Sequence, residues 1–306
     1  MKINWLSIAI AGVLLLAACS SPQAVQPQPT PQAPEKTVSP QLAPAAVLTD
    51  LAGREIEVQR VPERIVSLLP AATEILFALS KGDAVLAADP LSELPEGTVV
   101  ERVEPFAIAS ISGLNPDIVF VGKNFSPSAC EELVSEGIQV VYAAASSFGE
   151  IYASIALLAQ ITGTDAAELI EGMQKEAMEL SALAAELEPL NVFFALQKAG
   201  EGYAAAGPGS LENELVQLAG GQPVLAKPNE EYPVYSLEEL AAVEPDVILL
   251  SAELNYEAFV EQDELAKLEC VEQGRVFKLE QEVVPGPSVI ITLRHIYEAL
   301  EMALIS

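Results

Sequence analysis

The side chains that most often do chemistry in proteins are scarce in this sequence of 306 residues. It contains one histidine, His295, and three cysteines, whereas Asp and Glu together number 44. A nucleophile–base pair or a zinc site usually draws on several imidazole or thiolate groups, and neither a Gly-x-Ser-x-Gly sequence nor a metal-ligand spacing occurs. The residues therefore predict no catalytic residue and no metal site, with carboxylate-only chemistry as the open enzymatic alternative. We interpret His295 as a surface or packing residue of a C-terminal helix.

Cys19 is the cysteine with the clearest chemical role. An apolar run over residues 5–18 follows Lys2; it has the length of a signal-peptide core and is too short to span a bilayer. The run ends in Leu16-Ala17-Ala18-Cys19, which looks like a lipoprotein cleavage site. We therefore expect residues 1–18 to be a lipoprotein signal peptide and Cys19 to carry lipid at the periplasmic or extracellular face of the cell membrane. The alternative is an ordinary signal peptide with a chance cysteine.

The charge of the chain limits its partners. The formal net charge is −29 at pH 7, and the acidic side chains are scattered along the sequence rather than gathered in a tail. A surface of this sign repels nucleic acids and anionic lipid headgroups, so we expect no nucleic-acid partner. Cys130 and Cys270 are interpreted as two separate buried thiols. The alternative is a disulfide made in an oxidising compartment, which needs their Cα atoms within about 7 Å.

The first half of the chain is predicted to contain a linker and an N-terminal lobe. Residues 19–46 are rich in Pro, Gln and Ala, which predicts a disordered linker, and two short alternating segments around Gly53 then indicate a β-hairpin. The N-terminal lobe is predicted over residues 47–164. Its strands are expected at residues 64–69, 84–88, 117–121 and 139–142, and its helices at 73–82 and 128–136. Strands that alternate with helices predict a parallel sheet covered on both faces.

The second half is predicted to contain a connecting helix and a C-terminal lobe. Residues 165–188 lack Pro and are dominated by good helix formers, and residues 189–306 resume the alternation. Strands are expected at 191–196, 246–250 and 275–279, and helices at 211–219, 236–243 and 288–304. Leu114–Val119 (Leu-x-Pro-Asp-Ile-Val) is echoed by Val243–Ile248 (Val-x-Pro-Asp-Val-Ile). The predicted fold class is α/β, with two doubly wound lobes built on central parallel sheets, one long backbone helix joining them, and a ligand cleft between them.

These features together resemble the substrate-binding proteins of ABC importers, in the class whose lobes are joined by a single long helix. The resemblance runs from Thr49 to the end of the chain. It is carried by Thr49–Glu55, Arg64–Leu68, Leu114–Val119 and Leu218–Gly221. The family implies a non-catalytic protein without a cofactor, which binds cobalamin, a ferric siderophore, haem or a metal. It also implies the permease and ATPase subunits of the importer as partners.

The cobalamin-binding branch of this family is the most similar. Ser67–Glu74 (Ser-Leu-Leu-Pro-Ala-Ala-Thr-Glu) and Pro285-Gly286-Pro287 resemble its sequences. Tyr232 stands where that branch has an aromatic residue before Pro, and Glu280 falls near its acidic residue facing the corrin. A flat macrocycle fringed with amides needs an apolar slot, an aromatic wall and a few polar contacts, so the resemblance is chemically consistent.

The family also implies one glutamate on each lobe that docks to arginines of the permease. Glu238 matches the glutamate of the second lobe. Ala109 occupies the place of the glutamate of the first lobe, and either Glu104 or Glu101 is the nearby substitute. We therefore expect Glu238 and Glu104 to contact the permease, or the contact on the first lobe to differ from that of the family.

The predicted ligand-binding residues come from both lobes. They are Pro70, Ala71, Ala72, Thr73, Phe106, Phe125, Lys198, Tyr203, Tyr232 and Glu280. Several have a second interpretation: Thr73 is alternatively a helix N-cap, either tyrosine alternatively packs against its own lobe, and Lys198 or Lys123 alternatively faces solvent. Phe106 and Phe125 are the aromatic residues nearest to the place where the family has a large aromatic in the first lobe.

The predicted function is thus that of a lipid-anchored, monomeric binding protein that captures a corrinoid and delivers it to an ABC permease. One alternative keeps the fold and changes the ligand to a ferric siderophore or to haem, in which case Tyr203 or Tyr232 binds iron. The other alternative is an envelope scaffold lipoprotein whose cleft holds no ligand.

Overall fold

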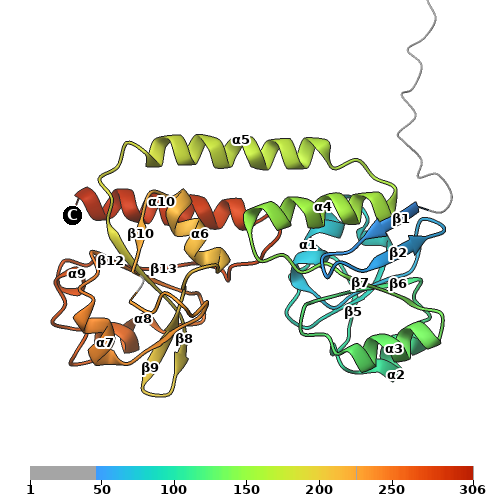
Figure 1. Ribbon diagram of the computed structural model, residues 1–306, viewed down its shortest axis with the longest axis horizontal. Helices are drawn as coiled ribbons and strands as arrows, with labels where there is room; N and C mark the ends of the chain where they lie inside the picture. Colours follow the sequence, from blue (N-terminus) through green and yellow to red (C-terminus); the bar gives the residue numbers. More distant parts are fainter. Residues whose placement is uncertain (1–45, 225, 306) are drawn as a thin grey trace, which may run out of the picture. The chain divides into compact units, whose positions relative to one another are not determined.

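The computed structural model describes residues 46–224 and 226–305 of the chain. The predicted signal peptide, Cys19 and the predicted linker up to residue 45 lie outside the described residues. Two sheets flanked by helices organise the described chain (Figure 1). A separate hairpin pairs β1 (Ala46–Thr49) with β2 (Glu55–Val58) in antiparallel register, which confirms the predicted hairpin.

The N-terminal sheet is parallel throughout, as predicted. Its strand order is β5-β4-β3-β6-β7, and each neighbouring pair is parallel. The strands are β3 (Ile65–Ser67), β4 (Val85–Ala88), β5 (Glu101–Arg102), β6 (Ile118–Val121) and β7 (Gln139–Tyr142). Four of them fall within the predicted apolar runs. The sequence pattern misses β5 because it is a short, exposed and charged edge strand.

Helices cover both faces of this sheet. They are α1 (Pro70–Ala78), the 3-10 turn η1 (Gly82–Ala84), α2 (Ile108–Gly113), α3 (Pro127–Ser135) and α4 (Phe148–Thr162). Side chains of β6 alternate between the faces: Ile118 and Phe120 join an apolar cluster with α1 and α4, whereas Val119 and Val121 join another with α2 and α3. We call this sheet with its helices the N-terminal lobe.

The centre of the C-terminal sheet is parallel, as predicted, and two antiparallel strands extend it at one edge. Its strands are β8 (Asn191–Ala199), β9 (Gly202–Ala205), β10 (Gln222–Pro223), β11 (Val234–Tyr235), β12 (Val247–Leu250) and β13 (Val276–Lys278). The pairs β8–β12, β12–β13 and β8–β10 are parallel, but β9 runs antiparallel to β8 and β11 antiparallel to β9. The reason is the tight turn at Gly200, where φ is 61°: it returns the chain directly from β8 into β9, and so short a connection joins only antiparallel strands.

The helices of the second half are α5 (Ala167–Ala184), α6 (Leu211–Leu218), α7 (Leu237–Ala242), α8 (Tyr256–Val260), α9 (Glu269–Glu272) and α10 (Val289–Ile305). Phe194 points to the face covered by α6 and α10, and its neighbour Phe193 to the face covered by α7 and α8. We call this sheet with α6–α10 the C-terminal lobe. Within the ranges described, no helix has both the length and the apolar character needed to cross a bilayer.

The predicted connecting helix is shorter than expected. Gly163 ends α4 in the left-handed conformation, with a φ of 64°, and the Asp165 carboxylate accepts a hydrogen bond from the Ala167 amide at 2.9 Å where α5 begins. α5 has 18 residues and ends at Ala184 rather than near residue 188. It packs on α6 and α10, both of the C-terminal lobe, and runs alongside α10 (Figure 1).

The repeated Pro-Asp sequence forms the same structure in both lobes. Asp117 precedes β6, and its Oδ2 accepts hydrogen bonds from the amides of Glu63 (2.9 Å) and Arg64 (3.0 Å), which lead into β3. Asp246 precedes β12, and its Oδ2 accepts a hydrogen bond from the amide of Asn191 (2.7 Å), which begins β8. Each aspartate therefore ties the amino end of its own strand to that of the neighbouring strand.

The two cysteines in the described chain are separate. Cys130 lies in α3 and Cys270 in α9, and both are buried and free. They belong to different apolar clusters, one on each lobe. The interpretation of two separate buried thiols is therefore confirmed.

Candidate functional site

Most of the predicted ligand residues follow the carboxyl ends of strands. In the N-terminal lobe, Pro70–Thr73 come soon after β3, Phe106 after β5 and Phe125 after β6. Because these strands are parallel, the three segments meet at one edge of the sheet, where open α/β sheets usually bind ligands. In the C-terminal lobe, Glu280 follows β13 at the corresponding edge.

A chain of buried hydroxyl groups supports the edge of the N-terminal lobe. Thr73 Oγ1 lies 2.8 Å from both Ser67 Oγ and Ser92 Oγ, and Ser92 Oγ donates a hydrogen bond to the carboxylate of Asp89. All four side chains are buried. Leu69 is the N-cap residue of α1, and Thr73 is the fourth residue of the helix. The alternative that Thr73 is a helix N-cap is therefore wrong, because Pro70 already begins the helix at a position proline favours.

The remaining residues of this segment differ in accessibility. Ala71 and Ala72 are buried, whereas Pro70 is half-buried. Pro70 is thus the residue of the segment whose side chain reaches the surface. Because the methyl groups of Ala71 and Ala72 are buried, the prediction that these residues contact a ligand applies to their backbone groups.

Two phenylalanines at the same edge stack on each other. The ring centroids of Phe106 and Phe125 are 6.2 Å apart and the ring planes differ by 9°. Phe125 is buried in the apolar cluster of the lobe, and its carbonyl accepts a hydrogen bond from the Tyr142 hydroxyl at 3.1 Å. Phe106 is 65% exposed. The pair therefore presents one supported aromatic face to solvent beside the carboxyl ends of the strands.

Tyr232 lies in a surface segment that passes close to Gly207. The Gly207 amide donates a hydrogen bond to the carbonyl of Glu231 at 2.8 Å, and a Cβ at Gly207 would lie 2.3 Å from the carbonyl oxygen of Glu230, so only glycine fits. Tyr232 is 49% exposed. Burial, together with the negative charges of Glu212 and Glu231, raises the pKa of Tyr232 to about 12. Its phenol is therefore protonated at neutral pH.

Tyr203 and Lys198 are cross-strand partners on β9 and β8. Tyr203 is buried: its hydroxyl accepts a hydrogen bond from the Gln262 amide at 2.7 Å, and its ring centroid lies 4.8 Å from that of Phe259. These contacts support the alternative that Tyr203 packs against its own lobe. Lys198 is exposed.

The predicted carboxylates are all exposed. Glu280 lies two residues after β13, Glu104 follows β5, and Glu238 lies in the first turn of α7. Ser236 and Glu239 form a capping box at the start of α7, which fixes the helix that carries Glu238. Ala109 is also exposed, on α2. Roles of Glu280 in ligand binding and of Glu104 and Glu238 in permease docking remain predictions.

Sequence reasoning missed buried polar groups at the start of α6 and in the segment after β13. Glu212 Oε2, Asn213 Oδ1 and Gln281 Nε2 are buried and lack a hydrogen-bond partner in the part of the chain that is described. Burial raises the pKa of the Glu212 carboxyl; hydrogen bonds of its own backbone and of Ser210 oppose the shift, and the charges of Glu231 and Glu282 add to it. In the sequence, Glu212 looks like an ordinary acidic residue in a first helical turn, so no local signal marks it.

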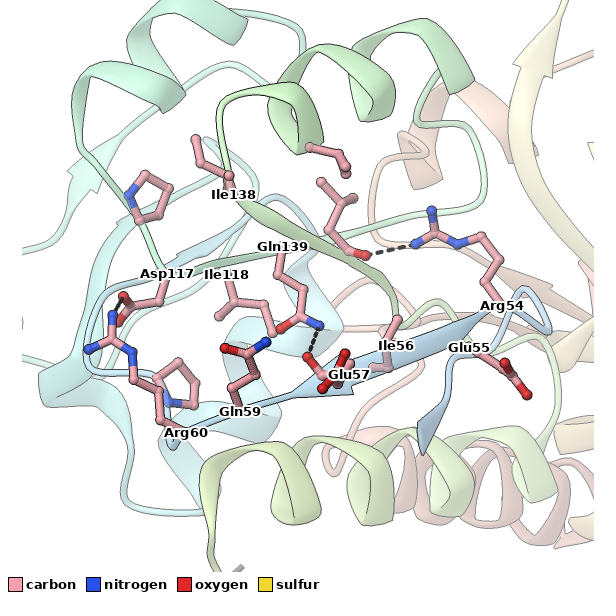
Figure 2. Close-up of a pocket in the computed structure, with 15 residues that line it drawn as sticks. Arg54, Glu55, Ile56, Glu57, Gln59, Arg60, Asp117, Ile118, Ile138 and Gln139 are labelled. Atoms are coloured by element: carbon pink, nitrogen blue, oxygen red, sulfur yellow. Dashed lines mark hydrogen bonds and ion pairs between the residues drawn. The ribbon is translucent and has the colours of Figure 1, made fainter. Parts of the chain in front are cut away.

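A cavity of about 590 Å³ lies at the opposite, amino-terminal edge of the N-terminal sheet, between β2 and β7 (Figure 2). Its polar groups bond to one another: Arg60 pairs with Asp117, Gln139 Nε2 donates to the carbonyl of Glu57 at 2.9 Å, and Arg54 Nη2 donates to the carbonyl of Val140 at 2.7 Å. The bonds of Gln139 and Val140 attach the hairpin to the edge strand β7, and the Arg60–Asp117 pair attaches the segment after β2 to the start of β6. We therefore interpret this cavity as a groove between the hairpin and the sheet, whose polar side chains bond within the lobe.

A second cavity, of about 400 Å³, occupies the same position in the C-terminal lobe. It is lined by residues 244–246, 267–270, 273 and 275, next to Asp246 of the repeated Pro-Asp structure. Both cavities lie away from the carboxyl ends of the strands, so the predicted ligand cleft remains a prediction. In the described ranges, no group of three or more His, Cys, Asp and Glu side chains is placed to hold a metal ion.

Two α/β lobes that share a continuous apolar cluster are the architecture of a two-lobed solute-binding protein. Residues 65–283 match the family described as periplasmic binding protein, and the chain belongs to this family.

Named relatives agree with that assignment. The chain is 24% identical over 310 residues to an uncharacterised ABC transporter substrate-binding lipoprotein of Bacillus subtilis, YvrC, covering 97% of this chain and 96% of the relative. It is 26% identical over 196 residues to the vitamin B12-binding protein of Yersinia pestis, covering 62% of this chain and 69% of the relative. The periplasmic haem-binding protein HutB of Vibrio cholerae superposes with a TM-score of 0.70 at 24% identity, over 78% of this chain and 98% of that protein. The last comparison shows a shared fold.

Proposed function

We propose that this protein is the substrate-binding lipoprotein of an ABC importer and that its ligand is a corrinoid or a similar planar chelate. The observation that carries the proposal is the similarity of this sequence to known binding proteins. The family match covers residues 65–283, and the named relatives include a vitamin B12-binding protein. The proposal assigns no residue a chemical step, because capture and delivery need only reversible contacts.

Two accessible aromatic rings support a planar ligand. Phe106 belongs to the N-terminal lobe and Tyr232 to the C-terminal lobe, and both are exposed enough to bury further area against a ligand. Macrocycles gain most of their affinity from apolar area packed on aromatic faces, with a few polar groups that fix orientation. Glu280 is our candidate for such a polar contact, whereas Tyr203 is less suited because its ring and hydroxyl are already used within the lobe.

The same proposal places the protein at the membrane. Acylation of Cys19 would tether it, and Glu238 and Glu104 are exposed carboxylates available to arginines of a permease. We expect Cys19→Ser to move the protein from the detergent phase to the aqueous phase in a phase-partition assay. Retention of the variant in the detergent phase would contradict the lipid anchor.

Thermal shift with a ligand panel tests the ligand class. Cyanocobalamin, haemin and a set of ferric siderophores are each added to the purified protein. A ligand present at a hundred times its Kd stabilises the native state by about 2.7 kcal/mol, which raises Tm by several degrees. A rise with cyanocobalamin alone supports the corrinoid proposal. A rise only with haemin or with a siderophore keeps the fold and refutes the ligand.

Variants locate the binding surface. We expect Tyr232→Ala to weaken binding about tenfold or more and Tyr232→Phe to weaken it less, since stacking survives in the second variant. Glu280→Gln tests the polar contact. Glu257→Gln is the matched control, because Glu257 is an exposed glutamate on α8. Equal affinity in the wild type and Tyr232→Ala would remove Tyr232 from the site.

Haem is the second candidate ligand because tyrosine is a known axial ligand of haem iron. The surroundings of Tyr232 oppose this role, since its pKa of about 12 disfavours the phenolate that iron binds. A visible spectrum of the haemin complex separates the cases: a tyrosinate-type charge-transfer band that is lost in Tyr232→Phe would favour haem over the corrinoid.

A further inference from the structure

We propose that Glu74 and Glu214 are positioning residues that fix the relative orientation of the two lobes. Each carboxylate belongs to a helix of one lobe and accepts hydrogen bonds at the N-terminus of a long helix of the other lobe. The two contacts are reciprocal. This inference concerns the relation between the lobes and does not depend on the identity of a ligand.

The first contact joins α1 to α10. Glu74, on α1 of the N-terminal lobe, accepts a hydrogen bond from the backbone amide of Ser288 and another from Ser288 Oγ at 3.0 Å. Ser288 directly precedes α10, the C-terminal helix. Burial raises the pKa of the Glu74 carboxyl, the two bonds from Ser288 oppose the shift, and the charge of Glu93 adds to it. The carboxylate is thus largely shielded from water and already bonded.

The second contact joins α6 to α4. Glu214, on α6 of the C-terminal lobe, accepts a hydrogen bond from the amide of Phe148 at 2.9 Å. Phe148 is the first residue of α4, in the N-terminal lobe, and its ring packs edge-on against Tyr152 one turn later. The amide of a first helical residue has no partner within its own helix, so the carboxylate from the other lobe supplies one.

The two contacts add direction to an otherwise non-directional interface. One apolar cluster includes Ile75 of α1, Ile151 of α4, Leu215 of α6 and Leu293 of α10, and therefore runs through both lobes. Apolar contacts hold surfaces together without selecting one angle. Charge-assisted hydrogen bonds to helix N-termini are short and directional, and the helix dipole strengthens them. Two such contacts at separate points oppose rotation of one lobe against the other.

The lack of a side chain at Gly286 leaves room for the first contact. A Cβ at Gly286 would lie 2.5 Å from Glu74 Oε2 and 3.5 Å from the carbonyl oxygen of Ala71. A side chain there requires the Glu74 carboxylate or the chain at Gly286 to move. We therefore expect Gly286→Ala to disturb the contact by shape alone, without removing a charge.

Single-molecule FRET on the full-length protein in mild detergent tests the proposal. Dyes are attached through non-canonical amino acids at the exposed positions Glu136, at the end of α3, and Glu257, on α8. We expect Glu74→Ala and Glu214→Ala each to broaden or shift the distribution of transfer efficiency, and the double variant to do so most. The amide of Ser288 should also exchange with deuterium about tenfold faster in Glu74→Ala.

Glu239→Ala is the matched control. Glu239 also accepts a backbone hydrogen bond at a helix start, from the Ser236 amide at 2.9 Å, but both residues belong to the C-terminal lobe. The control should leave the FRET distribution unchanged even where it lowers Tm. A destabilised fold alone would affect the control as well, so the comparison separates orientation from stability.

A double-mutant cycle completes the test. Because Gly286→Ala and Glu74→Ala act on the same contact, their effects on the FRET distribution should not add in the combined variant. A wild-type distribution in Glu74→Ala, Glu214→Ala and their combination would overturn the proposal. If the combined variant does not fold, Gly286→Ala and the conservative Glu74→Gln and Glu214→Gln carry the same test.

Discussion

At the scale of single residues, Glu212 has a carboxylate oxygen without a hydrogen-bond partner in the described chain. This oxygen, Oε2, is buried, and the negative charges of Glu231 and Glu282 repel a charge on this carboxylate. Because its pKa is raised in the folded state, the native protein binds more protons than the unfolded chain between the usual value of 4.5 and the raised value. The contribution of this group to stability is therefore lost as the pH rises through the raised pKa.

We expect Glu212→Gln to raise Tm at pH 7 by roughly 2 °C, because it removes a buried charge without removing volume. The difference should disappear below the usual pKa of 4.5, where the carboxyl is protonated in both states. Circular dichroism melts from pH 4 to pH 8 measure it. Glu257→Gln, at an exposed position, should show no such dependence, and a constant difference between Glu212→Gln and wild type would refute the assignment.

Thr73 offers a second test at this scale. Thr73→Val keeps the shape of the side chain and removes the hydroxyl that bridges Ser67 and Ser92, so two buried hydroxyls lose a partner. We expect a loss of about 1–3 kcal/mol in the free energy of unfolding, measured in urea. Thr73→Ser retains the hydroxyl and should lose less. A larger loss in Thr73→Ser than in Thr73→Val would show that the methyl group, and not the hydroxyl chain, carries the stability.

At the scale of elements, the repeated Pro-Asp structure explains how strand order is fixed in each lobe. Asp117 accepts two backbone amides and also pairs with Arg60, whereas Asp246 accepts one amide. We expect Asp117→Ala to lower the free energy of unfolding by about 1–3 kcal/mol, and Asp246→Ala to lower it by less. Urea titrations of the two variants give the comparison. A larger loss for Asp246→Ala would show that the number of bonds each aspartate accepts does not set its contribution to stability.

Elements with long apolar runs were predicted within a few residues, and those without such runs were missed. β3, β4, β6, β7 and β12 are largely buried strands whose side chains carry a strong signal. β9 was missed because its residues, Gly202–Ala205, are mostly small, and they form a strand through pairing with β8 and β11. The length of α5 was overestimated because helix formers continue past Ala184, where the chain turns toward β8.

At the scale of the whole molecule, the shared apolar cluster and the two carboxylate contacts predict cooperative behaviour. The cluster contains residues of both sheets, so neither lobe buries its own core completely. We expect urea unfolding to follow one transition, with coincident curves from far-UV circular dichroism and tyrosine fluorescence. Two separated transitions would show that the lobes unfold independently.

The sequence by itself determined the class of this protein. Strand and helix periodicity, the repeated Pro-Asp segment and the family motifs are local patterns, and each predicts structure from a few neighbouring residues. The tertiary structure alone decided which candidates are accessible: Tyr203 is packed inside its lobe, whereas Tyr232 and Phe106 reach the surface. It also brought Glu74 to Ser288 and Glu214 to Phe148, across 214 and 66 residues of chain. Such contacts depend on how helices from two lobes pack together, and no local pattern encodes that geometry.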